Sequence, residues 1–189
     1  MQKRYWKKIK KRYPFLNPRE HWYCGYELTK KERSGTPPIL ALDSGDIPVG
    51  WVKRFGHELC EDLRAEFIRC GCLNDVYIVQ AEEKYGRLTI SFSTMPAWCK
   101  ADDILGKYEE LSETVCIHCG STDAHMIGGG WVCPECRNCY NQCDNLYPYE
   151  EKIVEKNRKD SDEVKELRER VRMRPVSDIL PKQKRKGKR

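Results

Sequence analysis

The 189-residue sequence contains no hydrophobic run long enough to cross a membrane, and no apolar segment follows its basic first residues as in a signal peptide. It also lacks a P-loop, a dinucleotide-binding glycine motif and a nucleophile elbow. Histidine is scarce: the chain has four, and none follows His125. These absences predict a cytoplasmic protein without a membrane partner, and they disfavour the common nucleotide-binding and hydrolytic enzymes.

Cysteine, in contrast, is abundant. Eleven cysteines without a secretory signal indicate a reducing compartment and metal binding instead of a disulfide framework. Two pairs, Cys116-Ile-His-Cys119 and Cys133-Pro-Glu-Cys136, have thirteen residues between them, which is the spacing of a four-thiolate zinc site. The intervening chain is long enough for a hairpin with its turn at 128–130. The sequence therefore predicts a zinc ribbon with structural Zn²⁺ held by Cys116, Cys119, Cys133 and Cys136.

Other cysteines leave alternatives open. Cys133, Cys136, Cys139 and Cys143 also match the spacing of a ferredoxin-type cluster, but Asp144 replaces the usual proline and the intervening residues are polar. Cys139 and Cys143 are otherwise free thiols or spare ligands. His118 and His125 are further candidates to replace a cysteine ligand, although four well-spaced thiolates make loop roles more natural for them.

Charge is segregated along the chain. Residues 1–20 carry eight basic side chains and one acid, residues 181–189 carry six basic side chains, and residues 21–180 carry an excess of seven acids. Basic ends attract phosphate backbones without reading sequence, although such tails also occur simply as solvated segments. The candidate residues for binding nucleic acid or a partner are Lys3, Arg4, Lys7, Lys8, Lys10, Lys11, Arg12, Lys182, Lys184, Arg185, Lys186, Lys188 and Arg189.

Hydrophobic periodicity predicts an α+β fold. Apolar residues recur every four positions from Trp51 to Phe67, which is typical of an amphipathic helix; strands at 76–81 and 88–93 and a helix at 101–114 follow. The expected architecture is a small α-β-β-α core with a C-terminal zinc ribbon and charged helical and basic extensions. We expect a basic helix at 1–20, the core at 21–115, the ribbon at 116–143, and a charged helix with a basic tail at 144–189.

Two extensions are ambiguous. The first helix has an aromatic stripe that either packs on the core or leaves the helix free to lie on nucleic acid. The later helix, at 150–174, has a thin apolar seam and a possible capping box from Asp160 and Glu163. It either docks on the core, docks on a partner or extends into solvent.

Several motifs together resemble a group of small phage and prophage proteins with a K-[FY]-G-x-L hairpin and a terminal four-cysteine ribbon. They are Val49-Gly50-Trp51, Cys60-Glu61-Asp62-Leu63, Lys84-Tyr85-Gly86-Arg87-Leu88, Cys116-Ile-His-Cys119-Gly120 and Gly130-Trp131. The resemblance covers about residues 46–140. It implies a phage-encoded protein in a bacterial cytoplasm and carries no function of its own.

The predicted function is non-catalytic binding. In one hypothesis the protein binds DNA or RNA through its basic ends, with Trp6, Trp22 or Trp131 stacking on bases. In the other it is an inhibitor of a host defence complex, anti-CRISPR-like, that acts through protein contacts with a nucleoprotein target. A zinc-braced HNH-like nuclease is disfavoured, because Asp123-Ala124-His125 has too little chain around it for the metal-binding helix and no later histidine follows. A deaminase lacks its His-x-Glu motif.

Overall fold

A computed structural model describes residues 8–16, 47–129, 131–143, 145, 147–154 and 161–173. The chain is a mixed α+β protein, which confirms the expected fold class. Residues 8–12 are helical, and the later elements in chain order are η1 (Pro14–Leu16), α3 (Val49–Arg69), β1 (Ile78–Lys84), β2 (Arg87–Phe92), α4 (Ala101–Ser112), β3 (His125–Ile127), β4 (Cys133–Glu135), α5 (Arg137–Tyr140), α6 (Tyr149–Lys152) and α7 (Asp162–Met173). No helix in these ranges is both long and apolar enough to cross a bilayer.

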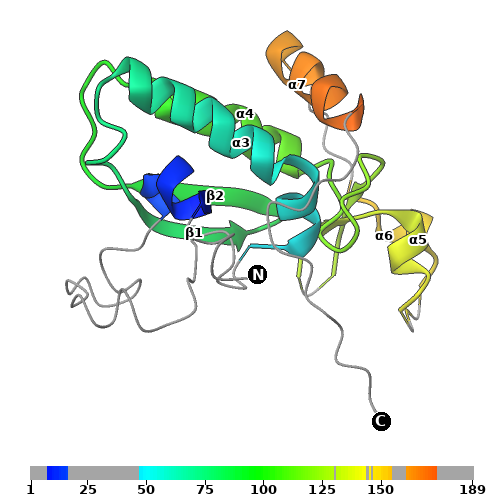
Figure 1. Ribbon diagram of the computed structural model, residues 1–189. Coiled ribbons are helices and arrows are strands. Elements are labelled where there is room, and N and C mark those ends of the chain that lie inside the picture. Colours follow the sequence, from blue (N-terminus) through cyan, green and yellow to red (C-terminus); the bar gives the residue numbers. More distant parts are fainter. Residues whose placement is uncertain are drawn as a thin grey trace.

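Helices α3 and α4 lie side by side over one face of the β1–β2 hairpin (Figure 1). The four-residue periodicity of α3 places its apolar stripe in the core, where Trp51, Phe55, Leu59, Leu63 and Phe67 are all buried. Antiparallel pairing runs from Ile78 opposite Phe92 to Lys84 opposite Arg87.

The turn of this hairpin is formed by Tyr85 and Gly86, with φ of 52° and 81°. Positive φ at both central residues matches the right-handed twist of the strands, so the turn closes the hairpin tightly. A Cβ at Gly86 would overlap the end of Met126 and lie 3.2 Å from the carbonyl oxygen of Val132. The β1–β2 turn therefore packs directly on the β3–β4 hairpin.

The N-terminal segment packs on the core of its own chain. Tyr13, Phe15 and Leu16 are buried, and the Phe15 ring lies edge-on to Phe67 with centroids 5.2 Å apart. Arg12 donates two hydrogen bonds, of 2.7 and 2.8 Å, to the Glu61 carboxylate on α3. The apolar side of this segment is thus used in folding, which leaves only its outer side for a partner.

Helix α7 docks across α3 and α4. Its thin seam of Val164, Leu167 and Val171 is buried, and Arg170 Nη2 donates to Asp62 Oδ2 on α3 at 2.5 Å. Ser161 caps the helix, because its Oγ accepts a hydrogen bond of 3.3 Å from the backbone N–H of Val164. Asp160, the expected capping residue, lies outside the described residues.

The first cysteine pair is attached to the start of α3. The backbone N–H of Gly50 donates to the carbonyl of Ile117 at 2.8 Å, and the Trp51 indole donates to the carbonyl of Val115 at 2.7 Å. Arg54 Nε donates to the carbonyl of Gly120 at 2.5 Å. A Cβ at Gly50 would overlap the carbonyl oxygen of Cys116 and lie 2.7 Å from the carbonyl carbon of Ile117, so only glycine permits this approach.

Candidate metal centre and the surface beside it

Four cysteines meet at one point beyond the N-terminal end of α3. The sulfur atoms of Cys116, Cys119, Cys136 and Cys139 all lie within 4.8 Å of one another, and those of Cys119 and Cys136 are 3.6 Å apart. Four sulfurs bound to one Zn²⁺ at about 2.3 Å would be about 3.8 Å from each other. This four-cysteine group can hold one tetrahedral metal ion.

A tight backbone turn positions the first pair. The N–H of Gly120 donates to the carbonyl of Cys116 at 3.0 Å, and the N–H of Cys116 donates to the carbonyl of Ser121 at 2.8 Å. Gly120 has a φ of +79°, which places it in the left-handed region that glycine adopts without strain. Its N–H···O bond closes the turn that brings Cys119 back beside Cys116.

A helical turn positions the second pair. Cys136 is the N-cap of α5 and Cys139 lies within it, while the N–H of Tyr140 donates to the carbonyl of Cys136 at 3.0 Å. Residues three apart on a helix share a face, with Cβ atoms about 5–6 Å apart. Both sulfurs therefore point toward the first pair.

The structure differs from the expected ligand set at one cysteine. Spacing predicts Cys133 as the fourth ligand, whereas Cys139 joins the group in the structure. Cys133 lies in β4, paired opposite Ile127 in β3. Because three residues of extended chain span about 10 Å, a strand cannot hold Cys133 and Cys136 side by side. The Cys133 thiol instead donates to Glu135 Oε1 at 3.4 Å, on the same face of the strand. Burial, followed by the Glu135 charge, raises the pKa of Cys133 to about 12.

The other sequence candidates also lie outside the group. Cys143 is exposed, so the expected alternative of a ferredoxin-type cluster from Cys133, Cys136, Cys139 and Cys143 does not assemble among the described residues. His118 Nε2 lies 3.4 Å from Glu135 Oε1, and the His125 ring lies edge-on to Tyr149. Both histidines contact the walls of the ribbon and not its cysteine centre.

The thiols of the group differ in their electrostatic surroundings. Burial raises the pKa of Cys136 and of Cys139. Burial also acts on Cys119, but the N–H of Ser121 and the neighbouring thiols outweigh it and lower the pKa of Cys119. A metal ion would replace the protons of all four, since only thiolates bind it.

A tyrosine layer supports the second cysteine pair. Tyr140 and Tyr149 pack edge-on with ring centroids 5.3 Å apart, and the Tyr149 hydroxyl donates to the carbonyl of Glu135 at 2.7 Å. On the opposite edge of β3, the N–H of Val154 donates to the carbonyl of Met126 at 2.8 Å. Residues after α5 thus pack against the β3–β4 hairpin, so the structure around the four-cysteine group includes residues beyond 143.

Two large aromatic side chains are exposed on neighbouring turns. Trp131, at the β3–β4 turn, is 67 % exposed, and Tyr85, at the β1–β2 turn, is 82 % exposed. The two turns touch where Gly86 packs against Met126 and the carbonyl of Val132. We call Tyr85 and Trp131 the aromatic pair. In the sequence, Trp131 belongs to the Gly130-Trp131 motif and Tyr85 to the K-[FY]-G-x-L hairpin motif. The hypothesis from the sequence includes Trp131 as a residue that stacks on bases and assigns no binding role to Tyr85.

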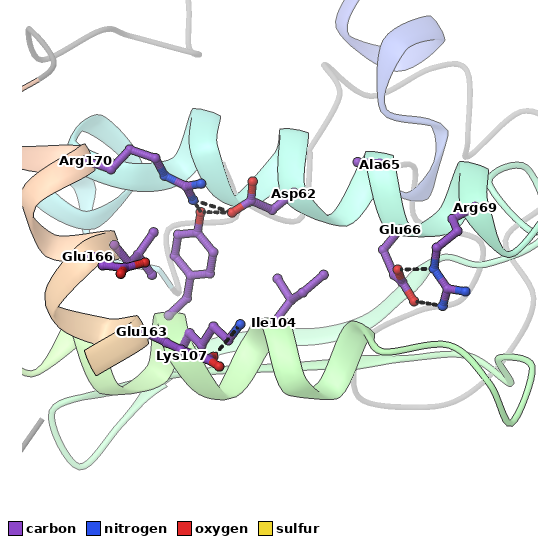
Figure 2. A pocket seen from close by; sticks show the side chains of 11 residues that line it. Asp62, Ala65, Glu66, Arg69, Ile104, Lys107, Glu163, Glu166 and Arg170 are labelled. Carbon is purple, nitrogen blue, oxygen red and sulfur yellow. Dashed lines mark hydrogen bonds and ion pairs between the residues drawn. The ribbon is translucent and has the colours of Figure 1, made fainter. Parts of the chain in front are cut away.

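A groove of about 690 Å³ lies between α3, α4 and α7, but ion pairs occupy most of its charged groups. Figure 2 shows Arg170 on Asp62, Lys107 on Glu163 at 2.6 Å, and Arg69 on Glu66 at 2.6 Å. Apolar groups, including Ile104 and Leu167, form much of the remaining wall. The groove is the seam between docked helices.

Few of the predicted basic binding residues fall in the described ranges. Lys8, Lys11 and Arg12 are exposed, with Arg12 engaged by Glu61, and Lys10 is half-buried, which lowers its pKa. The others lie outside the described residues: Lys3, Arg4, Lys7, Lys182, Lys184, Arg185, Lys186, Lys188 and Arg189. Comparison with protein-family models, with curated proteins and with solved structures found no match.

Proposed function

We propose that this chain is a phage-encoded, non-catalytic zinc-ribbon protein that binds nucleic acid or a nucleoprotein complex. The observation that carries the proposal is the four-cysteine group next to a hairpin that exposes Trp131 and that contacts the hairpin carrying the exposed Tyr85. The phage origin rests on the sequence resemblance alone.

The chemistry of the group favours zinc in a structural role. Four thiolates select zinc or an iron–sulfur centre, and a small tetrahedral set drawn from two C-x2-C pairs suits a single zinc ion. Four protein ligands fill the shell, so no position remains for a reactive water or a substrate oxygen. The ion would hold the ribbon against α3, and binding would fall to the surface of the ribbon.

The aromatic pair supplies a surface suited to unpaired bases. Aromatic side chains that are exposed on a rigid turn lose little entropy on binding, and stacking of one base contributes about 1–3 kcal/mol. Both side chains belong to hairpins that contact each other where Gly86 meets Met126 and Val132. Single-stranded DNA or RNA is therefore the form of nucleic acid that this surface would favour.

The charges of the central part and of the two ends of the chain differ in sign. Residues 47–129 contain thirteen acidic and eight basic side chains, so this part of the protein would repel phosphates. The basic segments at 1–20 and 181–189 would supply the phosphate contacts, with Lys8 and Lys11 exposed in the described part. Affinity should then depend steeply on salt, while the aromatic contribution should not.

A titration with labelled single-stranded oligonucleotides, read by fluorescence anisotropy at several salt concentrations, tests this proposal. Trp131→Ala should weaken binding about 5- to 150-fold, which corresponds to one lost stacked base. Trp98→Ala is the matched control, because Trp98 is 65 % exposed and lies after β2, at the end of the hairpin away from Tyr85. Equal effects of the two variants, or no binding by the wild type, would overturn the proposal.

Deleting residues 181–189 separates the electrostatic part. For every phosphate that the shortened chain no longer neutralises, the slope of log affinity against log salt should fall by about 0.7 for single strands. The deletion should flatten the slope without abolishing the effect of Trp131→Ala. An unchanged slope would mean that this tail does not contact phosphates.

The acidic excess of residues 47–129 favours a second candidate, an inhibitor of a host defence complex that binds through protein contacts. Acidic surfaces repel free nucleic acid and attract the basic surfaces of proteins that bind it. Capture of the tagged protein from bacterial lysate, with and without nuclease, distinguishes the two candidates. A single defined complex that survives nuclease supports the inhibitor, whereas partners that disappear support direct nucleic-acid binding.

A further inference from the structure

A second group of thiols lies at the opposite end of α3 from the four-cysteine group. The sulfurs of Cys70 and Cys99 and a carboxylate oxygen of Glu66 lie within 4.8 Å of one another. The buried Cys72 follows Cys70 by two residues. Two cysteines that are 29 residues apart in the sequence thus converge beside the buried carboxylate of Glu66.

The end of α3 creates this convergence. Gly71 has a φ of +72°, its N–H donates to the carbonyl of Ile68 at 3.0 Å, and the N–H of Cys72 donates to the carbonyl of Phe67 at 2.9 Å. This pattern of bonds reverses the chain after a helix and favours glycine at the left-handed position. It brings Cys72 back toward the last turn of α3, where Cys70 lies.

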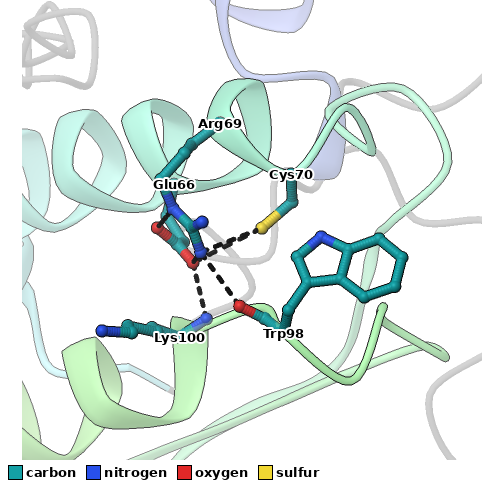
Figure 3. A network of polar contacts seen from close by, with 5 residues as sticks. All are labelled: Glu66, Arg69, Cys70, Trp98 and Lys100. Carbon is teal, nitrogen blue, oxygen red and sulfur yellow. Dashed lines mark hydrogen bonds and ion pairs between the residues drawn. The ribbon is translucent and has the colours of Figure 1, made fainter.

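The Glu66 carboxylate ties this end of α3 to the start of α4. Oε1 accepts the backbone N–H of Lys100 at 2.5 Å and the Cys70 thiol at 3.4 Å, and Arg69 donates to both carboxylate oxygens, at 2.8 and 2.6 Å (Figure 3). Arg69 also donates to the carbonyl of Trp98 at 2.9 Å. These bonds fix the backbone on either side of Cys99 relative to Cys70.

We propose that Cys70, Cys99 and a Glu66 oxygen, with the thiol of the nearby Cys72 as the fourth donor, form a second site for a thiophilic divalent metal ion such as Zn²⁺. Three sulfurs and one oxygen are a ligand set that zinc accepts. The four donors would carry four negative charges, of which the ion balances two, and Arg69 lies in contact with both Glu66 and Cys70 to balance a third. The site is independent of the proposed function, because it is at the other end of the hairpin from the aromatic pair.

The metal content of the full-length protein tests this inference, with Zn²⁺ or ¹¹³Cd²⁺ as the only added ligand. The wild type should bind two ions per chain, and Cys99→Ser should bind one. Cys139→Ser should lose the other ion and keep this one. Cys143→Ser is the matched control, because Cys143 is an exposed thiol outside both groups, and it should retain two.

¹¹³Cd NMR identifies which ion is lost. Two resonances are expected for the wild type, one from four sulfurs and one from three sulfurs and an oxygen, and only the second should disappear in Cys99→Ser. If circular dichroism shows that Cys99→Ser does not fold, Cys70→Ser replaces it as the test variant, because Cys70 is partly exposed. A wild type that binds a single ion, or a folded Cys99→Ser or Cys70→Ser variant that still binds two, overturns the proposal.

Discussion

The identity of the fourth cysteine ligand allows a sharp test, because spacing predicts Cys133 whereas the sulfurs that converge include Cys139. Replacing Cys139 by serine should weaken zinc binding strongly. Structural zinc sites of small domains bind with about 10–16 kcal/mol, so one of four thiolates contributes about 3–4 kcal/mol. That energy corresponds to a loss of about 100- to 1000-fold in zinc affinity.

Replacing Cys133 by serine should leave zinc affinity unchanged. The Cys133 thiol donates to Glu135 at 3.4 Å, and a serine hydroxyl can still make this hydrogen bond. The cost in folding stability should therefore be about 1 kcal/mol or less. Cys116→Ser and Cys136→Ser should resemble Cys139→Ser, because both residues belong to the ligand set in either assignment.

Competition with a chromophoric chelator at fixed pH measures zinc affinity for the wild type and the four variants. Circular dichroism of the zinc-loaded proteins would show that the variants are folded before affinities are compared. If Cys133→Ser loses zinc as Cys116→Ser does while Cys139→Ser keeps it, the structural assignment is refuted and the ligand set predicted from spacing is correct.

Three further predictions concern stability. Gly50→Ala should destabilise the fold by about 1–3 kcal/mol, because its Cβ would overlap the backbone at Cys116, whereas Gly106→Ala, with open space around it, should stabilise α4 by about 0.5–1 kcal/mol; urea unfolding compares the two. The hydrogen bonds from Arg12 hold the pKa of Glu61 below its usual value of 4.5. Glu61→Gln should therefore lower the free energy of unfolding by its full amount above pH 4.5 and by less as the pH falls further. A difference in unfolding free energy between wild type and variant that stays the same across an acid titration would contradict this. Leu167→Ala should cost about 2–3 kcal/mol and speed hydrogen exchange in α7 but not in α3; uniform protection would show that α7 docks by other contacts.

Periodic patterns located the core elements. The apolar stripe from Trp51 to Phe67 matches α3, and alternation at 88–93 matches β2, because burial on one face imposes a repeat that local sequence carries. The N-terminal segment was ambiguous, since an aromatic stripe fits a core and a partner equally well. Its position against Phe67 depends on contacts between residues far apart in the sequence.

The metal centre shows why spacing alone was insufficient. Cys133, Cys136 and Cys139 form two overlapping C-x2-C pairs, so the sequence offers two second pairs with equal spacing. The choice depends on where β4 ends and α5 begins, a boundary of one or two residues that local propensity does not resolve. The second thiol group was not predicted, because Cys99 lies 29 residues beyond Cys70 and only the packing of α4 on α3 brings them together.

The hydrogen bonds from Gly50 to Ile117 and from Trp51 to Val115 would couple a metal ion held by the four-cysteine group to the hydrophobic core. Loss of the ion would withdraw the carbonyl of Val115 that accepts the hydrogen bond of the buried Trp51 indole, so release of zinc and global unfolding should be parts of one equilibrium. A ligand that binds only the native state raises the free energy of unfolding by about 2.7 kcal/mol when its free concentration is a hundred times its dissociation constant. We therefore expect the lifetime of this protein in the cell to follow zinc supply, because proteases remove the unfolded chain when the metal is scarce.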